Sequence, residues 1–161
     1  MENASPSFEN FLFDVSPMQL PFVEAMHTYL LANGCTVKVE LAKSGYVISY
    51  VHAASKRTLA NYVFRKKGLL IRIYGENVAG YEPYLAELPE TMRKAIIKAP
   101  VCRRLLDETK CNKRCPMGNV FTLDGTLHKK CRYTTFMFLI EEESNPYIRS
   151  LVEKELAARS A

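Results

Sequence analysis

Apolar and polar residues alternate along the segment 37–74, in four short runs that are separated by turn residues. Alternation with a period of two places successive side chains on opposite faces of a β-strand. Ser44-Gly45 and Lys66-Lys67-Gly68 lie between runs and suit tight turns. The pattern therefore predicts an antiparallel meander with strands at 37–41, 46–51, 58–65 and 69–74.

Helical spacing of apolar residues occurs on both sides of this meander. Ser16-Pro17 followed by Gln19 is typical of a helix start, and Asn33-Gly34 is typical of a helix end. The buried stripe of this first helix is expected to contain Met18, Phe22, Ala25, Met26, Tyr29 and Leu30. Further helices are expected near 77–86, at 89–98 and from Asn145 onward.

The remaining chain predicts a hairpin and one more strand. Asp124-Gly125 separates the runs 119–123 and 127–130, as in a two-residue β-turn. Residues 133–140 are apolar on both faces, which predicts a central or covered strand. Residues 1–15 form an expected N-terminal arm that docks Phe8, Phe11, Leu12 and Phe13 on the core. We expect one α+β domain over 1–161, with a curved antiparallel sheet of about five strands packed against helices.

Composition agrees with one globular domain. The chain has 161 residues, of which 48% are hydrophobic and 24% charged, close to the averages of folded proteins. The longest dense apolar run, 136–140, is too short to cross a bilayer. The acidic N-terminus lacks the basic region of a secretory signal. We therefore expect a cytoplasmic protein with no membrane partner.

Four of the five cysteines cluster in the segment 101–132, where Cys102, Cys111, Cys115 and Cys131 are separated by eight, three and fifteen residues. Four thiolates suit a tetrahedral zinc ion and leave no open coordination position, so we predict a structural zinc site, with His128 as a substitute ligand. The segment has few apolar residues, and a metal would supply the missing cross-link. Reduced thiols without metal and a redox switch remain the alternatives.

The net charge of +5 is concentrated in two basic blocks, 35–75 and 93–132. If the fold joins them, one surface could bind an anionic ligand, nucleic acid or a protein partner. The candidate residues are Arg65, Lys66, Lys67, Arg72, Arg103, Arg104, Lys113, Arg114, Lys129, Lys130 and Arg132. Stacking faces could come from Tyr46, Tyr50, Tyr62 and Tyr74. The alternative is a solvated surface with half-buried tyrosines.

No catalytic constellation emerges from the sequence. The three histidines, His27, His52 and His128, lie far apart in the chain and suggest no nucleophile–base pair. The leading hypothesis is a non-enzymatic binding module with a structural zinc ion and a basic surface. The alternative is a thiol-based redox or small-molecule enzyme that uses the cysteine cluster.

The runs 64–75, 98–102, 115–118 and 130–133 resemble a family of uncharacterised bacterial proteins that have a cysteine-rich C-terminal segment. The resemblance covers nearly the whole chain and implies a bacterial origin, but it brings no activity, substrate or catalytic residue. The order of helix, meander and later helices is also similar to YdhG-like small α+β domains, which lack the cysteine-rich segment.

Overall fold

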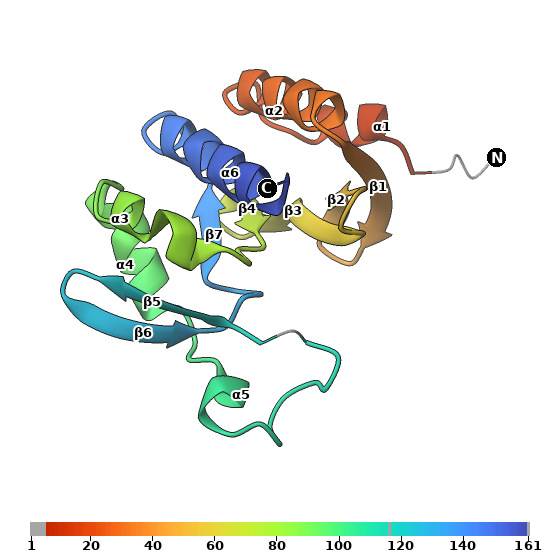
Figure 1. Ribbon diagram of the computed structural model, residues 1–161. Helices are drawn as coiled ribbons and strands as arrows, with labels where there is room; N and C mark the ends of the chain where they lie inside the picture. Colours follow the sequence, from red (N-terminus) through yellow and green to blue (C-terminus); the bar gives the residue numbers. More distant parts are fainter. Residues whose placement is uncertain (1–5, 116, 161) are drawn as a thin grey trace.

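The computed structural model describes residues 6–115 and 117–160. The predicted meander is confirmed, because each of its strands pairs antiparallel with the next. Its strands are β1 (Cys35–Ala42), β2 (Gly45–His52), β3 (Arg57–Arg65) and β4 (Gly68–Ile73). A fifth strand, β7 (Phe136–Leu139), pairs antiparallel with β4 and gives the order β1-β2-β3-β4-β7 (Figure 1). The predicted α+β class with a five-stranded antiparallel sheet is therefore confirmed.

The last strand of this sheet lies at an edge, although its sequence suggested a central or covered position. Phe136 and Phe138 are 1% and 4% exposed and belong to the main core. Met137 and Leu139 point to the other face, where Met92 of α4 (Glu90–Lys98) lines a cavity together with them. Both faces of β7 are thus covered, which explains why both are apolar.

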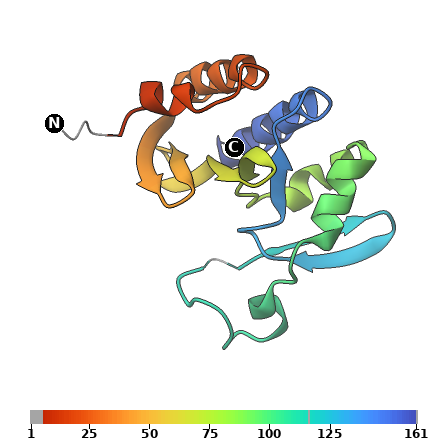
Figure 2. The same cartoon turned by 180° about the vertical axis from the view of Figure 1, so that it is seen from behind.

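Three helices cover one face of the sheet (Figures 1 and 2). They are α1 (Phe8–Phe13), α2 (Leu20–Ala32) and α6 (Asn145–Ser160). Their buried residues, such as Phe11, Leu30 and Ile148, pack with Tyr62 and Ile71 of the strands in one hydrophobic core. None of the helices in the described ranges is long and apolar enough to cross a membrane.

The N-terminal region differs from its sequence prediction in two details. Residues 1–5 of the expected arm lie outside the described residues, and the rest forms the short helix α1, which leaves Phe13 86% exposed. The next helix begins at Leu20 rather than at Pro17, and the Gln19 side chain donates to the carbonyl of Ile140 at 2.7 Å. Met18 consequently lies outside the helix and is 82% exposed.

A second group of elements lies at the opposite end of the molecule from α2 (Figure 1). It comprises the short helices η1 (Val78–Tyr81), α3 (Glu82–Leu85) and α5 (Arg103–Leu106) together with α4 and the hairpin of β5 (Asn119–Leu123) and β6 (Thr126–Lys130). The predicted hairpin is confirmed by its antiparallel pairing. It buries Phe121 and Leu123, which are 1% and 2% exposed, in the core beside Phe136.

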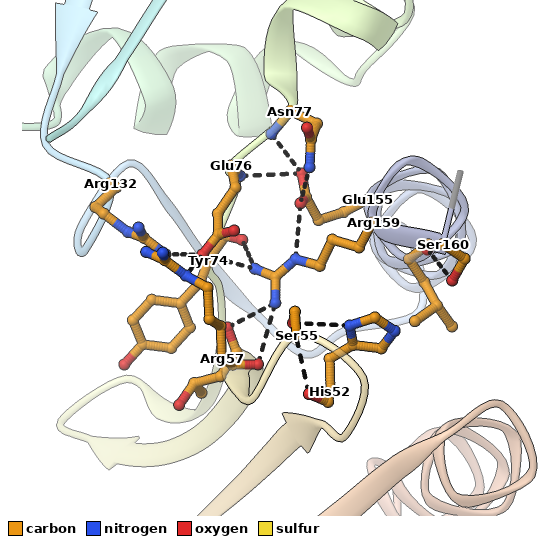
Figure 3. A network of polar contacts seen from close by, with 12 residues as sticks. His52, Ser55, Arg57, Tyr74, Glu76, Asn77, Arg132, Glu155, Arg159 and Ser160 are labelled. Atoms are coloured by element: carbon orange, nitrogen blue, oxygen red, sulfur yellow. Dashed lines mark hydrogen bonds and ion pairs between the residues drawn. The ribbon is translucent and has the colours of Figure 1, made fainter. Parts of the chain in front are cut away.

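A polar cluster connects the sheet and α6 to the chain that follows β4 and to the chain that follows β6. We call its members Arg57, Glu76, Arg132, Glu155 and Arg159 the arginine–glutamate network (Figure 3). Glu155 on α6 is fully buried and accepts five hydrogen bonds. Its donors are the backbone N–H groups of Glu76 and Asn77, the Asn77 amide, the Tyr81 hydroxyl and Arg159 Nε.

Arg159 satisfies its remaining donors on the sheet. Its guanidinium donates to the carbonyls of Arg57 and Thr58 at 3.2 and 3.1 Å and to the carbonyl of Tyr74 at 2.7 Å. One turn of α6 therefore holds the start of β3, the end of β4 and the chain that follows β4. A buried ion pair of this kind stabilises little by itself, but the loss of one partner leaves an uncompensated charge.

We predict that Glu155→Gln lowers the free energy of unfolding by about 3–5 kcal/mol. Both carboxylate oxygens of Glu155 accept hydrogen bonds, whereas the amide nitrogen that replaces one of them can only donate. Urea unfolding followed by circular dichroism measures this, since the chain has no Trp. The matched control is Glu153→Gln on the same helix, where the exposed pair with Arg149 at 3.6 Å contributes less than about 1 kcal/mol. Equal losses in the two variants would contradict the prediction.

Candidate anion-binding site

A hollow of about 460 Å³ lies where the cysteine-rich segment meets the sheet, at the start of β3 and the end of β4. We call it the arginine hollow, and its wall includes Arg57, Tyr74, Arg114, Cys115, Arg132 and Tyr133. A smaller cavity of about 210 Å³ shares Arg57 and Arg132 with it and extends to Glu76. The two shared arginines thus connect the hollow to the arginine–glutamate network.

Glu76 neutralises part of the positive charge beside the hollow. Its Oε1 accepts from Arg57 Nε at 2.6 Å and from Arg132 Nη2 at 2.5 Å, and Arg159 Nη2 lies 3.6 Å away (Figure 3). Burial by itself would raise the pKa of the Glu76 carboxyl. The hydrogen bond from Arg132 and the charges of the three arginines outweigh burial, so its pKa is lower than usual.

Positive charge nevertheless remains in excess around the hollow. Glu76 and Glu155 are the carboxylates of the network, and Arg57, Arg132 and Arg159 already share them. Arg114 is exposed and adds a third guanidinium to the wall, beside Arg57 and Arg132, which makes four with the buried Arg159 of the network. Unmatched positive charge at an open hollow of this kind attracts anions, because the protein beneath it screens charge less than water does.

A fifth arginine, Arg72, lies under the wall of the hollow. Its guanidinium sits 3.9 Å from the ring centroid of Tyr133, and the residue is 4% exposed. Its Nη2 lies 3.7 Å from the sulfur of Met137, while its buried Nε has no hydrogen-bond acceptor among the described residues. No carboxylate in the described ranges forms an ion pair with it. The cation–π contact with Tyr133 and the neighbouring Tyr74 hydroxyl are thus its compensation for burial.

The neighbour of Arg72 across the β3–β4 ladder carries a second unpartnered polar atom. Asn61 pairs with Arg72 in register and is 6% exposed. Its amide nitrogen donates to the Tyr74 hydroxyl at 3.2 Å, whereas its buried Oδ1 has no donor among the described residues. Burial raises the pKa of Tyr74 despite the opposing charge of Arg72, so the hydroxyl stays protonated. This face of the sheet is therefore polar and incompletely satisfied beneath the hollow.

The basic residues singled out from the sequence do not form one surface. Arg65, Lys66 and Lys67 are exposed at the β3–β4 turn. Arg57 lies at the other end of β3, about 26 Å away at 3.3 Å per residue. Arg114 and Arg132 line the hollow, Arg72 lies beneath it, and Arg103, Lys113 and Lys129 are exposed nearby in the sequence. The expectation that the fold joins both basic blocks is thus met only in part.

Two of these basic residues donate hydrogen bonds to backbone carbonyl groups of the protein itself. Lys130 is 6% exposed, and its ammonium donates to the carbonyls of Ile97 and Ala99 at 2.7 and 2.8 Å, at the end of α4. Arg104 donates to the carbonyls of Asn112, Lys113 and Cys115 and so closes the loop that carries two of the cysteines. The hydrogen-bonded groups of these two residues therefore have a structural role.

The stacking tyrosines also differ from expectation. Tyr50 and Tyr62 are 1% and 0% exposed in the core, so their rings are closed to a ligand. Only Tyr74 of the four proposed tyrosines lines the hollow. Arg57 and Tyr133, which the sequence did not single out as candidates, also line the hollow. Tyr133 directly follows Arg132 in the chain, and its place after the basic residues Lys129, Lys130 and Arg132 is the one signal that pointed to it.

The cysteines lie in different surroundings. Cys102 is buried, Cys111 is exposed, and Cys115 and Cys131 are half-buried. Cys102 and Cys131 flank a short antiparallel bridge, in which Cys102 N donates to the carbonyl of Lys129 and Cys131 N to that of Pro100. Gly118 passes close to them, since a Cβ there would approach Cys102 Sγ to 2.9 Å. Cys35 is a packed thiol whose burial raises its pKa.

The described residues contain no group of three or more His, Cys, Asp or Glu side chains arranged to hold a metal ion. The four cysteines and His128 are among these residues, and the His128 ring packs 5.8 Å from that of Phe121. Pro116, in the turn after Cys115, lies outside the described residues. The arrangement does not fit a four-thiolate zinc site, so zinc stays a prediction from the sequence.

A larger cavity of about 790 Å³ lies between the starts of α2 and α6. Its wall combines the apolar Phe22 and Ile140 with charges of both signs, among them Lys67 and Glu141. The arginine hollow is the better candidate because several charged groups of one sign converge on it. No family model matches the chain, and no curated protein and no solved structure is significantly similar to it.

The lowered pKa of Glu76 predicts a pH dependence of stability. The carboxylate binds its proton less readily in the folded state, so its stabilising effect is present above about pH 4.5 and is lost as the pH falls through the folded-state pKa. Glu76→Gln should lower the free energy of unfolding by about 3 kcal/mol at pH 7 and by less at pH 3. Urea titrations at both pH values measure the difference, with Glu143→Gln, an exposed residue, as control. The same loss at both values would contradict the pKa shift.

Proposed function

We propose that this protein is a binding module that holds a small anionic ligand in the arginine hollow. The observation that supports the proposal best is the excess of guanidinium groups at one partly enclosed site: five arginines lie at or beneath the hollow and in its network, against two carboxylates. Guanidinium groups form charge-assisted, often paired hydrogen bonds with carboxylates and phosphates. The hollow also has the size of a small-molecule site.

The arginines of the wall differ in how firmly the protein holds their side chains. Arg114 is exposed and makes no ion pair among the described residues, so its guanidinium is available to an incoming anion. Arg57 and Arg132 are already oriented by Glu76, which lowers the entropy that they lose when a ligand binds. Binding would therefore combine two fixed donors with one adaptable donor. Nucleic acid or an acidic protein segment would be larger ligands of the same site.

We predict that wild-type protein binds inorganic pyrophosphate at low salt, and that Arg114→Gln weakens this binding about tenfold. A hydrogen bond between charged groups contributes roughly 1.5–3 kcal/mol, and about 1.4 kcal/mol corresponds to a factor of ten. Isothermal titration calorimetry measures the affinity. The control is Arg65→Gln, which removes an equally exposed arginine at the other end of β3 and should leave binding unchanged. Failure of the wild-type protein to bind, or equal weakening in both variants, would refute the proposal.

The zinc ion belongs to the proposal on sequence grounds alone. Coordination by Cys102, Cys111, Cys115 and Cys131 would require a different arrangement of the loop at 107–118 from the one described. The competing hypothesis is a thiol-based enzyme, and one observation favours it: Cys115 lines the same hollow as Arg57 and Arg114.

A single set of measurements separates these hypotheses. If zinc is bound, elemental analysis of protein purified without chelator should give about one zinc per chain, and Cys111→Ser should lower both the zinc content and the thermal midpoint. Alkylation of the thiols should then be slow until chelator is added. Four freely reacting thiols without metal would exclude the zinc site. Fast labelling of Cys115 near neutral pH, absent in Cys115→Ser, would favour the enzyme.

A further inference from the structure

We propose that the ligand of the arginine hollow is a nucleotide, with its phosphate on the arginines and its base stacked on Tyr133. This inference rests on the anion binding proposed above and adds the chemical class of the ligand. It starts from Tyr133, a half-exposed aromatic residue that lines the hollow and directly follows Arg132 in the chain.

The ring of Tyr133 is held in place from two sides. The Arg72 guanidinium lies over one face at 3.9 Å, and the Tyr74 ring meets it edge-on, with 5.7 Å between centroids and an interplanar angle of 65°. Tyr133 nevertheless keeps 50% of its surface exposed. A ring that is fixed and still exposed can stack on a flat ligand with little further loss of side-chain freedom.

The buried cation behind the ring strengthens this argument. Arg72 draws electron density of the Tyr133 ring toward its own face, so the opposite face is depleted and stacks more favourably on an electron-rich base. The ligand would in turn help to compensate a guanidinium that has no carboxylate partner among the described residues. Arg72 therefore acts here through Tyr133 as a positioning residue.

The two parts of a nucleotide match the two parts of the hollow. Arg57, Arg114 and Arg132 offer the phosphate its charged donors, and Tyr133 offers the base its stacking face within the same cavity. The cavity of about 460 Å³ lies within the size range of small-ligand sites.

Calorimetric titrations with AMP, ribose 5-phosphate and pyrophosphate test the inference. We expect AMP to bind about tenfold more tightly than ribose 5-phosphate, because stacking adds to the affinity only when a base is present. Tyr133→Leu should abolish this tenfold ratio, which is measured between the two ligands within the same variant. Tyr133→Phe should keep the ratio, since the ring and not the hydroxyl stacks.

The outcomes separate this inference from the proposed function. If the wild-type protein binds pyrophosphate but has equal affinities for AMP and ribose 5-phosphate, the nucleotide inference is wrong and the anion-binding proposal stands. An unchanged ratio in Tyr133→Leu would overturn the role of Tyr133. Absence of pyrophosphate binding would overturn both proposals. An oligoadenylate of five nucleotides distinguishes a free nucleotide from single-stranded nucleic acid as the ligand. Tighter binding than AMP with a steeper salt dependence identifies nucleic acid, and equal affinity identifies the free nucleotide.

Discussion

The ion pairs of the last helix connect parts of the chain that lie far apart in the sequence. Glu155 and Arg159 lie one turn apart on α6. Glu155 accepts from the backbone N–H of Glu76, and Arg159 donates to the backbone carbonyls of Arg57 and Tyr74. Because Glu155 is fully buried, its charge requires this complete set of donors. The geometry of α6 therefore fixes where Glu76 stands. Glu76 in turn fixes Arg57 and Arg132, so the position of the arginine hollow follows from the same buried charge.

This arrangement explains how a positively charged site can exist on a stable fold. Arginines that faced one another without carboxylates would repel and spread apart. Glu76 holds Arg57 and Arg132 together, yet one carboxylate cannot neutralise them and Arg159 at the same time. The remaining charge is available to a ligand. If the proposed anion binds there, structural pairing and ligand binding would use the same side chains, and the anion would relieve the repulsion between the arginines.

Sequence patterns predicted the elements that depend on local order. Alternation gave the meander, and Asp124-Gly125 gave the β5–β6 hairpin. Patterns could not identify the network, because Glu76 is separated from Arg57 by 19 residues and from Arg132 by 56. No periodicity relates such positions, and a carboxylate buried by tertiary packing has the same local signature as an exposed one. For the same reason Lys130 was assigned to the surface, although its ammonium closes the end of α4.

The cysteine-rich segment raised the question of what holds a polar stretch in place. Positively charged side chains of this segment hold it by hydrogen bonds. Arg104 donates to three carbonyls of the loop, and Lys130 connects the hairpin to the end of α4. Phe121 and Leu123 then anchor that hairpin in the core. These contacts supply cross-links of the kind that we had expected from a metal. Any ion bound by the thiols would therefore add to an existing framework, and its main effect would fall on the loop that carries Cys111, Arg114 and Cys115 beside the hollow.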